Sequence, residues 1–367
     1  MQNKSTKYNL LMSVCTAIVV MTAINSIGIA TNLVSSTFFN VIQASTIIVG
    51  YGIVIYVSKK IKISSIMLIG FDIILIILNH SLAMVSLALI VMMIEVFSYS
   101  NELDYRRLLR IYFSIVLSLF LVIVMMYYLF NFNNHDFSMW RNGAMIYRKA
   151  LGFLQPNVAS MLWISIFFSF IGLLNDRHVF IKLVAFLIPS WFLFNETQSR
   201  TSMYVLILLA MAVVLLKNRL DSQAPFLLKK ATFSMPIILT TISLILLFYP
   251  TNRVIDSLLS GRITLYKTFY QQYGIHLIGQ SALEEAMLDN SYLQAIMSKG
   301  ILFFLVLLFI IVVLLGHKKS YTYRSLLLFM GYFLISFTET SLQHFELLLP
   351  IVLVSMIKGS DKEVHLK

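Results

Sequence analysis

The sequence predicts an all-α, polytopic membrane protein that forms a single membrane domain over residues 1–367. Hydrophobic residues make up 59% of the chain and charged residues only 12%, whereas a soluble domain carries about 25% charged residues. A soluble protein of this composition would expose large apolar surfaces, and disorder requires the opposite composition. The apolar runs are continuous rather than alternating, which also disfavours a β-barrel.

Twelve apolar runs have lengths suited to crossing about 30 Å of hydrocarbon, so we expect about twelve transmembrane helices. The third and fourth runs share one apolar block that is interrupted at Asn79-His80, which predicts a tight hairpin. The twelve runs are 9–29, 37–57, 63–79, 81–98, 111–130, 157–175, 179–195, 202–217, 233–250, 300–316, 325–340 and 344–357.

The basic residues predict the orientation of these helices. If the N-terminus is cytoplasmic, so is the C-terminus, and 20 of the 28 Lys and Arg residues lie on the cytoplasmic side, as the positive-inside rule requires. Because most Lys and Arg residues are explained by this cytoplasmic preference, the net charge of +12 does not require a nucleic-acid partner. The outer cations are Arg141, Arg148, Lys149, Arg200, Arg253, Arg262, Lys267 and Lys299.

These outer cations are confined to the loop 131–156, the turn 196–201 and the loop 251–299. Placing cations outside opposes the topology rule, so we expect the outer surface to need positive charge there. Anchoring of the side chains to lipid phosphates is the alternative explanation. Within 251–299, the apolar spacing over 252–273 predicts an amphipathic helix that lies along the membrane interface.

Arginine is the side chain best suited to bidentate contact with phosphate. Arg141, Arg148, Arg200 and Arg262 are therefore candidate phosphate ligands. The alternative explanation for the polar turn around Arg200 is that its Ser and Thr residues simply cap a helix. Asp72, in the middle of the third apolar run, is a candidate ion-coupling residue of a transporter or a residue hydrogen-bonded to a neighbouring helix.

Three further outer residues could take a proton. Asp289 is the first candidate base, Glu339 the second, and His276 the third. Alternatively, Asp289 is only a negative charge near a helix N-terminus, where the helix dipole favours it. We expect no metal and no cofactor, because the outer side has no Asp-x-Asp and Cys15 is the single cysteine of the chain.

Five segments together carry a resemblance to a known family: Arg148-(x)3-Gly-Phe-(x)2-Pro-Asn, Gln-Ser-Arg-Thr-Ser around Arg200, Gly-Arg at Arg262, Asp-Asn-Ser-Tyr-Leu at Asp289, and Thr-Glu at Glu339. Their order and side resemble the Wzy-type polysaccharide polymerases and the related O-antigen ligases. Arg141 and Gly152, with ten residues between them, resemble the loop motif of these polymerases. The second copy departs from it, because eleven residues separate Arg262 from Gly274.

The resemblance implies a GT-C-like enzyme of the bacterial plasma membrane that polymerises undecaprenyl-diphosphate-linked repeat units on the outer face. It implies inverting, metal-independent glycosyl transfer, with a chain-length regulator and a flippase as candidate partners. The four arginines would then bind the diphosphate and stabilise the leaving group. A flippase for lipid-linked oligosaccharide and a ligase that uses another acceptor are the two alternatives.

Overall fold

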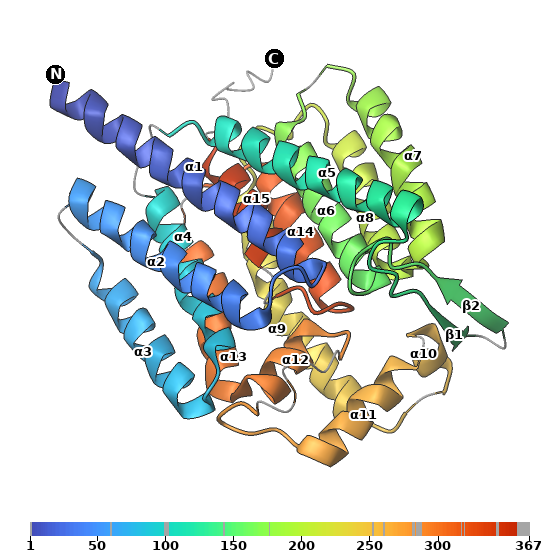
Figure 1. The fold of residues 1–367 in the computed structure, drawn as a ribbon. Helices are drawn as coiled ribbons and strands as arrows, with labels where there is room; N and C mark the ends of the chain where they lie inside the picture. Colours follow the sequence, from blue (N-terminus) through green and yellow to red (C-terminus); the bar gives the residue numbers. More distant parts are fainter. Residues whose placement is uncertain are drawn as a thin grey trace.

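The structure is a computed structural model that describes residues 2–58, 61–98, 103–141, 144–175, 177–251, 253–259, 261–280, 283, 288–316, 318, 320–342 and 345–357. Helices dominate the described part of the chain (Figure 1). The elements are α1 (Gln2–Ala30), α2 (Ser36–Ser58), α3 (Ile63–Asn79), η1 (Leu82–Val85), α4 (Ser86–Ser98), α5 (Tyr105–Phe130), β1 (Phe137–Arg141), β2 (Ala144–Arg148), α6 (Pro156–Leu173), α7 (Val179–Thr197), α8 (Arg200–Leu215), α9 (Phe226–Phe248), α10 (Arg253–Leu258), α11 (Arg262–Tyr273), α12 (Ser291–Ser298), α13 (Gly300–Phe309), η3 (Ile310–Leu315), α14 (Tyr323–Ser336) and α15 (Phe345–Met356).

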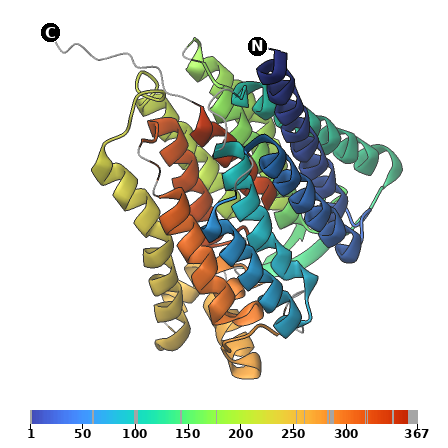
Figure 2. The same ribbon diagram turned by 90° about the vertical axis from the view of Figure 1, so that its left-hand side faces the viewer.

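A helical membrane architecture is confirmed. Six of the described helices, α1, α2, α5, α6, α7 and α9, are long and apolar enough to cross a membrane. Six shorter apolar helical segments occupy the other predicted apolar runs. Helices α6 and α15 are mostly buried and pack against each other at the centre of the bundle, with α5 and α14 beside them (Figures 1 and 2).

The predicted hairpin between the third and fourth apolar runs is present. Helix α3 ends at Asn79, and His80 adopts the left-handed conformation with φ 49°. Ser81 then accepts a hydrogen bond from the backbone N–H of Ala83 at 3.2 Å. This cap satisfies one of the free N–H groups of the following helix and lets the chain reverse within a few residues.

The loop 131–156 contains an antiparallel β-hairpin that the sequence analysis did not predict. Strand β1 pairs with β2 in a register that places Phe137 opposite Arg148. Asp136 fixes the base of the hairpin, since it accepts hydrogen bonds from the Tyr147 hydroxyl at 2.8 Å and from the Ala150 N–H at 2.7 Å. These bonds tie both ends of the hairpin to one carboxyl group.

Within the predicted helical segment 252–273, the described residues form two helices, α10 and α11, and Gly261 before α11 has φ 80°. Helix α11 buries Ile263 and Tyr266, and it packs against α9 and α12. Leu265, which was expected on the membrane-facing side, is exposed. The buried side of α11 therefore faces the protein, where Tyr266 belongs to one apolar cluster with Leu247 of α9 and Leu293 of α12.

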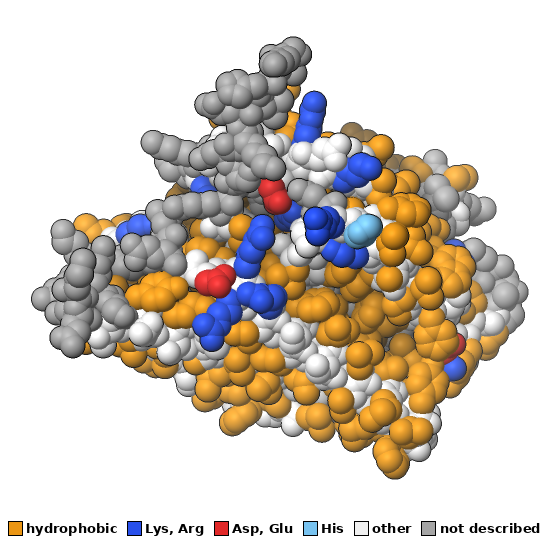
Figure 3. Space-filling model, turned by 90° about the horizontal axis from the view of Figure 1, so that it is seen from above, with side chains coloured by type: hydrophobic (Ala, Val, Ile, Leu, Met, Phe, Trp, Pro, Cys, Tyr) orange, Lys and Arg blue, Asp and Glu red, His pale blue; other side chains and the backbone are white. Residues whose placement is uncertain are grey.

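Opposite ends of the bundle differ in character. The N-terminus of α1 lies at one end, while the hairpin, α10, α11 and α12 lie at the other (Figure 1). Viewed from the end that holds the N-terminus, Lys and Arg side chains gather near the middle of an otherwise largely apolar surface (Figure 3). The hairpin and the divided helix are thus brought together at the end away from this basic surface.

Candidate functional site

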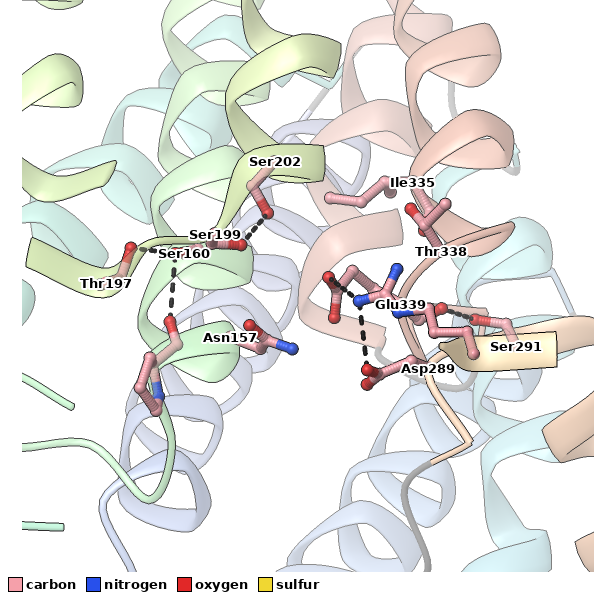
Figure 4. Close-up of polar contacts among 12 residues, drawn as sticks. Asn157, Ser160, Thr197, Ser199, Ser202, Asp289, Ser291, Ile335, Thr338 and Glu339 are labelled. Atoms are coloured by element: carbon pink, nitrogen blue, oxygen red, sulfur yellow. Dashed lines mark hydrogen bonds and ion pairs between the residues drawn. The ribbon is translucent and has the colours of Figure 1, made fainter. Parts of the chain in front are cut away.

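Three residues that the sequence analysis selected form one charged cluster at the end that holds the hairpin. Nη2 of Arg262 lies 3.1 Å from Oδ2 of Asp289 and 3.4 Å from Oε1 of Glu339. The three residues come from the start of α11, the approach to α12 and the segment after α14 (Figure 4). A single guanidinium group is therefore shared by two carboxyl groups that are 50 residues apart in the sequence.

The start of α11 is fixed by a local cap. Asp256 on α10 accepts hydrogen bonds from the backbone N–H of Ile263 at 2.9 Å and of Thr264 at 3.3 Å, and from the Thr264 hydroxyl at 2.6 Å. Free N–H groups in the first turn of a helix and the helix dipole both favour a carboxylate at this place. Asp256 thereby holds Arg262, the first residue of α11, in position.

Asp289 is presented by the start of α12. It has a left-handed backbone with φ 50°, and Asn290 after it caps α12 by accepting from the N–H groups of Tyr292 and Leu293 at 3.1 and 3.0 Å. The Asn290 amide also donates to the Ser243 hydroxyl of α9 at 2.9 Å. Asn290 is therefore the N-cap of α12, and Asp289, directly before it, pairs with Arg262.

Glu339 lies three residues beyond the end of α14 and is almost completely buried, with a side-chain exposure of 3%. Its backbone N–H donates to Ile335 O at 2.8 Å, and its carbonyl accepts from the Ser291 hydroxyl at 2.5 Å. Burial raises the pKa of the Glu339 carboxyl, and the charge of Asp289 raises it further, while Arg262 opposes both effects.

Arg148 reaches the same region from the hairpin. Its Nε donates to Thr197 O at 2.8 Å, and its Nη2 donates to Oδ1 of Asn157 at 2.5 Å. The guanidinium group also lies over the ring of Phe137 at 5.5 Å. The charge of Arg148 lowers the pKa of Glu339, as that of Arg262 does.

The other predicted site residues lie outside these contacts. The backbone of Arg141 pairs with Ala144 in the hairpin, and its side chain is outside the described residues. Arg200 is the first residue of α8, and its side chain is exposed. His276 is exposed, and its Nε2 lies 2.8 Å from Tyr273 O at the end of α11. No described contact joins His276 to the cluster.

Several residues of the site were not selected from the sequence. Asn157 holds Arg148 and points from the first turn of α6 toward the Arg262 cluster (Figure 4), but beside Pro156 it predicted only a turn. Ser291 joins the start of α12 to Glu339. Tyr266 donates its hydroxyl to Asp289 O at 3.2 Å. Their partners are distant in the sequence, so no spacing rule could have selected them.

The cluster combines fixed guanidinium groups with carboxyl groups in a largely buried setting. Arginine has five N–H donors, so Arg262 retains donors for an anionic ligand after binding both carboxyl groups. Its side chain is 13% exposed and that of Asp289 is 26% exposed. The described residues contain no group of three His, Cys, Asp or Glu side chains that could hold a metal ion. The arrangement can bind an anion and can exchange a proton beside it.

Comparisons with protein-family models, with curated proteins and with solved structures found no match to this chain.

Proposed function

We propose that this protein is a glycosyltransferase that polymerises undecaprenyl-diphosphate-linked repeat units on the outer face of the bacterial plasma membrane. The supporting observation is the Arg262 guanidinium group, which lies 3.1 Å from Asp289 and 3.4 Å from the buried carboxyl group of Glu339. Arg148 is held by Thr197 and by Asn157, and Asn157 points toward this cluster (Figure 4). A lipid-borne diphosphate needs cationic donors, and a sugar hydroxyl that attacks needs a proton acceptor.

In the proposed reaction, a hydroxyl group of the acceptor repeat unit attacks the anomeric carbon of the lipid-linked donor. The bond between that carbon and the diphosphate oxygen breaks, and the diphosphate leaves with the electron pair. The hydroxyl proton passes to Asp289, which is the more accessible carboxyl group, or to Glu339 as the second choice. Arg148 and Arg262 stabilise the charge that develops on the departing diphosphate.

The proposal includes a GT-C-like topology with twelve transmembrane helices and both termini in the cytoplasm. Six of these spans would be the shorter apolar segments, which must cross a thinner part of the bilayer or end in buried turns. Placement of the basic surface of Figure 3 on the cytoplasmic side follows the positive-inside rule. A chain-length regulator and a flippase are the partners that such an enzyme would require.

The glycan size profile of a deletion strain tests this proposal. Complementation with the unmodified gene should restore long polysaccharide, whereas Arg148→Ala should leave single lipid-linked repeats on the outer face. Because Arg148 also binds Thr197 O, the amount of the variant in the membrane must be compared with that of the unmodified protein. Normal polymer length with Arg148→Ala would refute the proposal.

A flippase remains the second candidate because of Asp72. This carboxyl group is buried in α3, where Oδ2 accepts from the Ala88 N–H at 3.1 Å and Oδ1 has no hydrogen-bond partner. Buried ionisable groups in membrane helices often serve ion coupling. Accumulation of single repeats on the cytoplasmic side of the deletion strain would favour transport. Transfer of finished glycan to a different acceptor would favour a ligase.

A further inference from the structure

An apolar groove lies between α7 and α8. It has a volume of about 360 Å³, within the roughly 300–1,000 Å³ typical of small-ligand sites. We call it the α7–α8 groove, and Leu187, Ile188, Trp191, Phe194, Met203 and Ile207 are among the side chains that line it. Ile188 and Trp191 are exposed at its edge while Phe194 is buried at its floor. The groove therefore opens on the side of the bundle that faces lipid.

The floor of the groove offers no free polar group. Ser190 is the one polar side chain among the lining residues. Its hydroxyl accepts from Trp163 Nε1 at 2.7 Å and donates to Phe186 O at 2.7 Å. Since this hydroxyl is already satisfied, a polar ligand would gain nothing inside the groove. A purely hydrocarbon occupant is therefore the one that matches its lining.

The end of the groove toward the hairpin is polar. Arg200 begins α8 there, and Glu196 in the last turn of α7 is paired with Lys149 at 2.5 Å. Arg200 precedes Met203 by three residues and Ile207 by seven, so all three share one face of α8. On α7, the exposed Asn195 follows Trp191 by four residues in the same way. Arg200 therefore stands about one helical turn, roughly 5 Å, beyond the last apolar lining residue of α8.

This end of the groove is joined directly to the charged site. Thr197 is the last residue of α7, and its carbonyl accepts from Nε of Arg148 at 2.8 Å. The Thr197 hydroxyl lies 3.0 Å from the Ser160 hydroxyl of α6 (Figure 4). A molecule with an apolar tail in the groove would thus carry its headgroup past Arg200 toward the residues that bind Arg148.

We propose that the α7–α8 groove holds the first isoprene units of the polyisoprenyl chain of the lipid-linked substrate, with Arg200 bound to its phosphate. This inference rests on the proposed function and adds the position of the lipid. It also separates the roles of two arginines. Arg200 holds the substrate in the ground state, whereas Arg262 stabilises the departing diphosphate. Charge complementarity distinguishes this lipid from zwitterionic bilayer lipids, which bring no net negative charge to Arg200.

Photocrosslinking of the full-length protein in nanodiscs tests the binding itself. The photoreactive p-benzoyl-phenylalanine replaces Ile188 in the groove or, as the matched control, Leu208, which is exposed on α8 and is not a lining residue. The probe is tritiated undecaprenyl phosphate. We expect saturable labelling at position 188 that unlabelled undecaprenyl phosphate suppresses and excess phosphatidylglycerol does not. Equal labelling at both positions, or suppression by phosphatidylglycerol, would overturn the proposal.

A substitution that fills the groove gives a second, kinetic test. Ile207→Trp should raise KM at least tenfold for a substrate with the full polyisoprenyl chain and leave KM unchanged for an analogue that has no isoprene units. Leu208→Trp should change neither value. Equal effects on both substrates would contradict the inference. If no variant or unmodified protein transfers sugar while crosslinking at 188 stays specific, the proposed function fails and the lipid site stands.

Discussion

Arg262 offsets much of the unfavourable free energy of placing two carboxyl groups in a largely buried site. Glu339 is almost fully buried, and the described contacts of its carboxyl group with a cation run to Arg262 at 3.4 Å. An isolated buried carboxylate is strongly unfavourable, and removing its partner exposes that cost. Arg262 therefore has two functions: it balances Glu339 and Asp289 in the resting protein, and in the proposed reaction it meets the departing diphosphate.

We expect Arg262→Ala to lower the initial rate of polymerisation by roughly a hundredfold to a thousandfold, which is typical for the loss of one group that stabilises a developing anion. Lys267→Ala is the matched control, because Lys267 lies on the same helix and its amine binds Thr251 at 2.7 Å outside the cluster. The rates of both purified variants in nanodiscs should be compared. Similar losses in the two variants would point to a general effect on α11.

The raised pKa of Glu339 predicts a pH dependence. Because the folded protein holds this proton more tightly than an unfolded chain does, the contribution of Glu339 to stability is lost as pH rises through its raised pKa. If Glu339 is the base, activity should rise with pH and reach half its maximum above the usual carboxyl range. The pH–rate profile of Glu339→Gln should then lack this rise, whereas Asp289→Asn should retain it. Retention of the rise in Glu339→Gln would assign the proton to another group.

Short turns place the helices and the hairpin around the site. The segment between β2 and α6 anchors to other helices, since the N–H of Leu154 donates to Ala30 O at 2.9 Å. Gly152 within it has φ 85°, and a Cβ atom there would lie 2.8 Å from Cγ2 and 3.2 Å from O of Ile123. Glycine is required at this position both by its backbone conformation and by the close approach to α5.

Gly152→Ala should therefore destabilise the protein by more than about 1 kcal/mol, since alanine is strained at positive φ. Gly70→Ala is the matched control, because no atom lies within 4 Å of a Cβ placed there and Gly70 is within α3. Alanine in a helix should be neutral or stabilising. Thermal unfolding in detergent measures both effects, and an unchanged unfolding temperature for Gly152→Ala would contradict the expected strain.

The molecule as a whole separates its charges between two ends. One end holds the hairpin, α10, α11 and the Arg262 cluster, while Lys and Arg gather on the surface at the end that holds the N-terminus (Figures 1 and 3). In a bilayer this arrangement fixes the orientation of the helices, because moving a charged loop through the hydrocarbon is energetically unfavourable. The position of the charged residues thus decides on which side of the membrane the proposed reaction occurs.

Accessibility of engineered cysteines tests this orientation. Ser138→Cys, in the hairpin, should react with a membrane-impermeant maleimide in intact cells, and Asn218→Cys, after α8, should react only after permeabilisation. Both positions are exposed, so burial cannot explain a difference between them. The single native cysteine, Cys15, is buried, and Cys15→Ser removes it from the background. Labelling of Asn218→Cys in intact cells would reverse the topology.

Most of the helical framework could be predicted from the sequence. A continuous apolar run must become a helix in a bilayer, because no water satisfies its backbone groups there. For this reason the helical segments follow the predicted apolar runs closely, including the reversal at Asn79-His80. Arg148, Arg262, Asp289 and Glu339 could be selected because charged residues outside the cytoplasmic segments are few.

Contacts between distant segments could not be predicted in this way. The hairpin depends on Asp136, which accepts from Tyr127 of α5, and α11 packs against α9 and α12. Composition and periodicity report only local preferences, whereas these features arise from partners far along the chain. The sequence alone determined that this is a helical membrane protein and predicted a few cations and carboxyl groups on its outer side. Only the tertiary structure decided that Arg262 lies between Asp289 and Glu339, because hydrogen bonds and burial depend on three-dimensional proximity.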